Sequence, residues 1–277
     1  MSKKTSADIP SLMMLIWLAF YIFAVFYASR WADFILIIAC AAPMVIFKKQ
    51  HRGATFGSKD GNVFKYKFKE YALSIVFCIC GCAFISAVTF LLFKHFGMAS
   101  TASLSRADFP YLLVFSCFIP AFFEEWLVRG GVLGAVAERG GAGVWFCSIV
   151  FMLMHADASK WPYALFAGVC ITSIVYLCES IYVGMVLHFL NNFTSLLLSY
   201  LPNAVAEYVA LAIITVILIV SFMMLKKCNI YRDAIKVLSC VDKGSLKELF
   251  SPAFLIFAVV MLLSMCGMLF GKMLPSQ

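Results

Sequence analysis

Three ionisable side chains interrupt an otherwise apolar stretch of this chain. Glu124, Glu125 and Arg129 lie within the apolar run from Tyr111 to Val136. A charge at the centre of a bilayer costs about 2.5 to 3.5 kcal/mol on insertion scales, so such residues usually mark a functional site. Glu125 and Arg129 are four residues apart on one helical face and can form an ion pair. Glu124 points about 100° away from Glu125 and needs other partners.

Further polar residues occur in the apolar segments that follow. His155 ends the run that begins at Val144, and His188 lies four residues before Asn192 in a later run. At about 1.5 Å rise per residue, Glu124 and His155 lie about 21 Å from the inner ends of their helices, Asn192 about 18 Å and His188 about 12 Å. We therefore expect these four polar side chains to meet in one buried layer, walled by Phe151, which lies one helical turn before His155.

These residue types fit the hydrolysis of a peptide bond. A carboxylate and a histidine that face a trapped water can act as general base and proton shuttle. A second histidine and an amide can donate hydrogen bonds to a developing oxyanion. The serine-nucleophile motif Gly-x-Ser-x-Gly is absent from the chain. The pattern favours a water-activating site over a covalent nucleophile.

Each feature taken alone also has a purely structural explanation. The pair Glu125 and Arg129 could hold one helix in place, and His155 could bond to a neighbouring helix. His188 and Asn192 could likewise join two helices by hydrogen bonds. The convergence of all these residues at matching depths favours a catalytic or ion-handling site over separate structural roles.

Composition defines the class of protein. The chain is 64% hydrophobic and 13% charged, whereas soluble domains carry about 25% charged residues. We predict an all-α, polytopic transmembrane helical bundle of about eight to nine spans, organised as one integral-membrane domain over residues 1–277. The net charge of +8 comes mainly from loops beside the apolar runs, so we expect contact with membrane lipids and none with nucleic acid.

The basic connections define an orientation. If Lys3 and Lys4 are inside, nine crossings place the connections Lys48–Glu70, Glu138–Gly141 and Lys226–Phe250 on the same face. This distribution follows the positive-inside rule. We therefore expect the N-terminus and the basic loops to be cytoplasmic, in the inner membrane if the cell is bacterial. The expected apolar runs are 12–28, 33–47, 71–93, 111–136, 144–155, 163–178, 181–200, 205–225 and 252–270.

The spacing of the polar residues resembles that of a known family. Glu124-Glu125-x-x-x-Arg129, Phe151-x-x-x-His155 and His188-x-x-x-Asn192 are similar, in this order, to three motifs of the CAAX-protease and bacteriocin-processing (CPBP, Abi or Rce1-like) intramembrane proteases. The motif-bearing core spans residues 109–200, and the flanking helices carry no signature of the family.

The resemblance implies an intramembrane endopeptidase with an all-helical core and a catalytic cavity open towards the cytoplasm. By the resemblance, Glu124 and His155 activate the water, and His188 and Asn192 stabilise the oxyanion. Glu125 and Arg129 position the helix. The expected substrate is a peptide or protein tail, with or without a lipid group. In eukaryotic relatives it is a prenylated C-terminal tail, and in bacterial ones it is often a small secreted or regulatory peptide.

Three alternatives stay open. Glu124, His155 and His188 could hold zinc with an open water position, although His-Glu-x-x-His is absent and Asn192 is a poor zinc ligand, so we favour a mechanism without a cofactor. The chain could instead be a non-catalytic immunity or regulatory partner with the same fold. A proton-coupled transporter would also bury Glu and His, but it predicts an internal repeat, which the sequence lacks.

Overall fold

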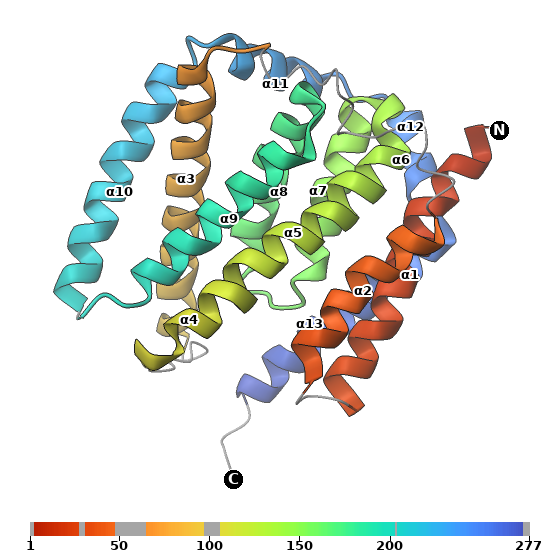
Figure 1. The fold of residues 1–277 in the computed structure, drawn as a ribbon, viewed down its shortest axis with the longest axis horizontal. Helices are drawn as coiled ribbons and strands as arrows, with labels where there is room; N and C mark the ends of the chain where they lie inside the picture. Colours follow the sequence, from red (N-terminus) through yellow and green to blue (C-terminus); the bar gives the residue numbers. More distant parts are fainter. Residues whose placement is uncertain (1–2, 28–30, 48–64, 97–105, 203, 274–277) are drawn as a thin grey trace.

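The computed structural model describes residues 3–27, 31–47, 65–96, 106–202 and 204–273, and every regular element in these ranges is a helix (Figure 1). The α-helices are α1 (Lys3–Tyr27), α2 (Ala32–Ile46), α3 (Phe68–His95), α4 (Phe109–Leu112), α5 (Ile119–Glu125), α6 (Gly134–Val136), α7 (Gly141–Met154), α8 (Trp161–Cys178), α9 (Ile181–Leu198), α10 (Ala204–Leu225), α11 (Asn229–Ser239), α12 (Lys243–Leu249) and α13 (Pro252–Met273). The all-helical prediction is confirmed for these residues. Most of the connection Lys48–Glu70 lies outside them.

The expected count of eight to nine membrane spans is not confirmed by helix length and composition within the described residues. Within the described residues, six helices are long and apolar enough to cross a membrane, and the bent pair α12–α13 would make a seventh. The apolar helices α2 and α7 have 15 and 14 residues. At about 1.5 Å per residue they are about 21 to 23 Å long, short of the roughly 30 Å hydrocarbon core.

One end of the bundle carries most of the lysine and arginine side chains that the structure describes and is called the basic end below. Here α11 and α12 lie across the bundle (Figure 1). The beginning of α3 is tied to α11, because Tyr66 donates a hydrogen bond to Asp233 at 2.7 Å and the backbone N–H of Asn229 donates to Glu70 at 2.6 Å. Arg139 reaches Glu248 of α12 at 2.8 Å.

The opposite end is called the far end. Here α4 begins and α9 ends, and the rings of Phe109 and Tyr200 lie 5.8 Å apart. The hydroxyl of Tyr111 donates a hydrogen bond to Asp33 at the start of α2. The helices therefore run between a basic end and a far end.

The connection Lys226–Phe250 was expected to be a loop, and the structure instead forms α11 and α12 there. In α11, Ile230 is buried, whereas Arg232 and Lys236 are exposed. An apolar stripe opposite a charged face is typical of a helix lying at a surface. The sequence contained this periodicity, but the segment is too polar to be identified as a span.

The motif-bearing helix is interrupted twice. Between Phe109 and Arg139, the π-helical segments Leu113–Phe118 (η3) and Trp126–Leu133 (η4) lie on either side of α5. Pro120 lacks a backbone N–H and cannot donate to the carbonyl of Ser116, four residues earlier. Wider π turns are frequent at functional sites. The interruption of this helix therefore consists of π-helical turns in place of regular α-helical ones.

Candidate active site

A cavity of about 410 Å³ contains all four residues predicted to be catalytic. Its walls come from the helix Phe109–Arg139, from the turn between α7 and α8 with the start of α8, and from α9. The lining residues are Leu112, Ser116, Cys117, Pro120, Glu124, His155, Lys160, Tyr163, His188, Asn191, Asn192, Ser195 and Leu196. The four polar side chains selected by their spacing thus surround one space.

The predicted ion pair has a third member. Arg129 donates a hydrogen bond through Nη1 to Glu125 Oε1 at 2.6 Å, and both side chains are fully buried. His188 Nδ1 contacts the same carboxylate oxygen at 2.9 Å. The direct partner of His188 is thus Glu125 and not Glu124, with which it was expected to share one polar layer. The pair thus orients a residue of the cavity as well as its own helix.

The rest of the Arg129 guanidinium is held by its surroundings. Its Nε donates to the Thr172 hydroxyl at 3.3 Å, and the group lies 4.3 Å from the ring centre of Phe151. Within the described residues, Arg129 Nη2 and Glu125 Oε2 have no hydrogen-bond partner. Removing one member of a buried ion pair usually costs about 3 to 5 kcal/mol, because the other charge is left uncompensated. The geometry of Glu125 is therefore strongly fixed by its neighbours.

A glycine lets α9 approach this buried carboxylate. A Cβ atom at Gly184 would lie 2.8 Å from Glu125 Oε2 and 2.7 Å from Val175 Cγ2. Gly184 is one helical turn before His188 and faces the same way. The missing side chain therefore allows His188 to reach Glu125.

Hydrogen bonds fix which ring nitrogen of each histidine faces the cavity. His155 Nδ1 lies 2.9 Å from the carbonyl oxygen of Phe151. A carbonyl and a carboxylate only accept, so Nδ1 carries the proton in His155, and likewise in His188 against Glu125. Nε2 is then the nitrogen left for the cavity. Phe151 separates the two histidines, with its ring 4.9 Å from the His155 ring and 5.5 Å from that of His188.

Asn192 is held by the backbone of the motif-bearing helix. Its Nδ2 donates a hydrogen bond to the carbonyl oxygen of Ser116 at 3.2 Å. This is the carbonyl that Pro120 cannot satisfy. An amide nitrogen has two hydrogens, so a second remains for another acceptor. A proline in the helix thus provides an anchor for the polar group opposite it.

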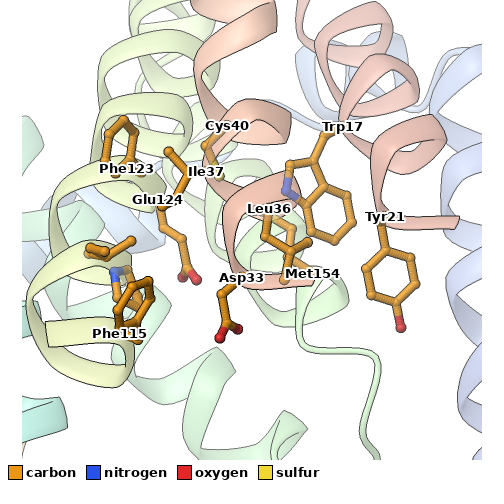
Figure 2. A pocket seen from close by; sticks show the side chains of 12 residues that line it. Trp17, Tyr21, Asp33, Leu36, Ile37, Cys40, Phe115, Phe123, Glu124 and Met154 are labelled. Carbon is orange, nitrogen blue, oxygen red and sulfur yellow. The ribbon is translucent and has the colours of Figure 1, made fainter. Parts of the chain in front are cut away.

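Glu124 differs from its neighbour. The carboxylate has no hydrogen bond or ion pair with any residue in the described part of the chain, and the side chain is partly exposed. It also lines two adjoining cavities, of about 330 and 140 Å³. Figure 2 shows the smaller one, where the carboxylates of Glu124 and Asp33 point the same way and Trp17 and Tyr21 lie across from them. Glu124 is the free carboxylate of the site.

Several lining residues were not selected from the sequence. Lys160 and Tyr163 line the large cavity, and Trp17, Tyr21 and Asp33 line the adjoining ones. These residues lie in or near loops, or on flanking helices without a motif. Their spacing in the sequence thus did not select them as functional residues. The helices α1 and α2 therefore help to enclose the site.

The residues do not fit a zinc centre. In the described ranges, no group of three His, Cys, Asp or Glu side chains is arranged to hold a metal ion. Glu124, His155 and His188, the alternative ligand set, line one cavity without converging on one point. The zinc-dependent version of the site is not supported by this geometry.

The large cavity and its neighbours lie toward the far end. Their lining residues include Asp33 at the start of α2, Leu112 near the start of the motif-bearing helix and Ser195 near the end of α9. None comes from α11 or α12. The resemblance implied a cavity open towards the cytoplasm, the face expected for the basic loops. The structure places the basic end and the cavities at opposite ends, so the two expectations do not agree.

Comparison with known proteins supports the family resemblance. No match was found among curated proteins or among solved structures. Residues 106–194 match the family model described as type II CAAX prenyl endopeptidase Rce1-like, and this segment contains all three motifs. It supports, at the level of the family, an integral multi-pass membrane protein of the CAAX protease type. The motif-bearing core of this chain is therefore similar to the Rce1-like, CAAX-protease family.

Proposed function

We propose that this protein is an intramembrane endopeptidase that hydrolyses peptide bonds with a water activated by Glu124 and His155. The observation that carries the proposal is the cavity shared by Glu124, His155, His188 and Asn192. Glu124 is unpaired within the described residues, and His155 has its Nε2 free of the bond to Phe151. A free carboxylate and an oriented imidazole are the parts that general-base catalysis requires.

In this mechanism, a water lies between Glu124 and His155. Its oxygen attacks the carbonyl carbon of the scissile peptide bond while its proton passes to the Glu124–His155 pair. The carbonyl oxygen becomes an oxyanion and accepts a hydrogen bond from Asn192. His188 can add a second through Nε2 in its imidazolium form, in which both ring nitrogens carry protons. When the carbon–nitrogen bond breaks, the stored proton moves to the leaving amine.

A glutamate variant tests the proposal. We expect Glu124→Gln to lower peptide hydrolysis at least 10²-fold, the low end for loss of a general base. The matched control is Glu138→Gln, an exposed position near the basic end of the same helix, which we expect to keep wild-type activity. The substrate can be found by mass spectrometry of membrane and secreted peptides from cells with wild type or Glu124→Gln.

Two outcomes would contradict the mechanism. Wild-type cleavage by a folded Glu124→Gln protein would remove the glutamate from catalysis. Full biological complementation by a Glu124→Ala/His188→Ala double variant would instead favour a non-catalytic immunity or regulatory partner.

Metal removal gives a second prediction. Since the His and Glu side chains of the site do not converge on one point, we expect protein washed with a chelator to keep its full activity. The measurement is the rate of peptide hydrolysis beside the metal content of the same sample. Activity that is lost on chelation and restored by zinc alone would support the zinc-dependent alternative.

A further inference from the structure

The position of the cavities relative to the basic end bears on which side of the membrane supplies the substrate. This inference rests on the proposed peptidase function and names the side from which that site is reached.

The two ends differ strongly in basic side chains. At the basic end, the described residues include Lys65, Lys67, Lys69, Arg139, Lys226, Lys227, Arg232, Lys236, Lys243 and Lys247. At the far end, the lysine and arginine side chains that the structure describes are Lys94 and Lys160. Lysine and arginine in short loops mark the cytoplasmic side, whereas acidic residues contribute little to this rule. The basic end is therefore the cytoplasmic end.

The length of α8 gives the depth of the cavity mouth. This helix has 18 residues, flanked by Lys160 and Glu179, and is about 27 Å long. A hydrocarbon core is about 30 Å thick, so the two charged residues lie near opposite interfaces. Tyr71 at the start of α3 contacts Cys178 with an oxygen–sulfur distance of 3.3 Å, which places the Glu179 side at the basic end. Lys160 lies at the far interface.

The same lysine lines the cavities that contain Glu124 and His155. Lys160 is exposed and contributes to both the cavity of about 410 Å³ and that of about 330 Å³. Ser195, also exposed, lines the larger one near the end of α9. The cavities thus extend from the buried Glu125–His188 contact to the far interface. Along the described chain, no residue of the cytoplasmic connections lines them.

We infer that the catalytic cavity opens on the non-cytoplasmic face of the membrane. The substrate class is then a polypeptide segment that has already crossed the membrane, such as an exported peptide or the outer part of a membrane protein. A lipidated tail that stays in the cytoplasm would lie on the wrong side. Water for hydrolysis enters from the same outer face.

Cysteine labelling tests the opening without requiring a substrate. In a Cys240→Ser background, which removes the exposed native thiol, one variant carries Lys160→Cys and a second carries Lys236→Cys on α11. A third variant, Ser195→Cys, makes a smaller change at the cavity mouth. It provides a second labelling position there if the Lys160→Cys protein does not fold. The probe is a membrane-impermeant maleimide applied to intact spheroplasts and to inverted vesicles, with labelled sites identified by mass spectrometry.

We expect the cysteines at 160 and 195 to react only in spheroplasts, and the cysteine at 236 only in inverted vesicles. Reaction of the cavity cysteines only in inverted vesicles, or from the same side as position 236, would overturn the inference. Cleavage sites lost in Glu124→Gln cells are expected in translocated segments, and sites confined to cytoplasmic segments would also overturn it. An absence of any lost cleavage, with labelling as expected, would instead contradict the proposed peptidase function alone.

Discussion

Two adjacent glutamates have different surroundings in this protein. Glu125 is fully buried and bound by Arg129 and His188 through one carboxylate oxygen, whereas Glu124 faces the cavity. A helix turns by about 100° between neighbouring residues, so one side chain points into the bundle while the other points into the open space. The first is a positioning residue, and the second is the proposed catalytic base.

At the residue scale, the buried ion pair gives a stability prediction. Arg129→Leu leaves Glu125 buried without its cation, and we expect a loss of about 3 to 5 kcal/mol in the free energy of unfolding. The control is Lys65→Leu, which removes an ion pair with Asp233 whose two side chains are each 42% exposed, and a loss of at most about 1 kcal/mol is expected there. Denaturant unfolding in detergent measures both. Equal losses of unfolding free energy in the two variants would mean that burial does not strengthen the Glu125–Arg129 ion pair.

At the element scale, the π-helical interruption around Pro120 connects backbone structure with the site. The proline leaves the Ser116 carbonyl without its helical donor, and Asn192 of α9 takes that place. The helix gives up regular hydrogen bonding at this turn, and a polar side chain of the cavity gains a fixed orientation. The missing helical hydrogen bond thus leaves a carbonyl that positions Asn192, the proposed oxyanion donor.

Replacing the proline separates these two effects. In Pro120→Ala the new N–H competes for the Ser116 carbonyl, so we expect kcat to fall by up to about tenfold, the value of one hydrogen bond. The thermal stability is expected to stay equal or rise, because an interior proline disfavours a helix. Pro110→Ala, at the exposed start of the helix, is the matched control and should change neither quantity. Unchanged kcat in Pro120→Ala would show that Asn192 does not depend on this carbonyl.

On the scale of the whole molecule, helices outside the motif-bearing core complete the site. Trp17 and Tyr21 of α1 stack with ring centres 5.2 Å apart and line both smaller cavities beside Glu124 (Figure 2). Trp17 also contacts Phe257 of α13 edge to face at 6.3 Å. The N-terminal helix therefore lines the space in which a substrate would lie, and the C-terminal helix packs against one of its lining side chains.

The half-buried Tyr21 offers a prediction at this scale. Tyr21→Ala widens both adjoining cavities, so we expect KM to rise several-fold with little change in kcat, as for a residue that contacts substrate equally in the ground and transition states. Tyr21→Phe keeps the ring and should behave as wild type. Steady-state kinetics on one peptide would measure KM and kcat separately for each variant. A fall in kcat with constant KM would place Tyr21 in the chemical step instead.

The sequence by itself determined the all-helical class, the position of each long apolar helix, the pairing of Glu125 with Arg129 and the polar layer around Glu124. These follow from hydrophobic length and from a fixed rise and rotation per residue, which are local properties. The tertiary structure decided that His188 binds Glu125, that Pro120 frees a carbonyl for Asn192, that α1 and α2 enclose the site, and toward which end the cavities lie. These features depend on the tilt and rotation of helices packed against one another, and no spacing within a single helix specifies them.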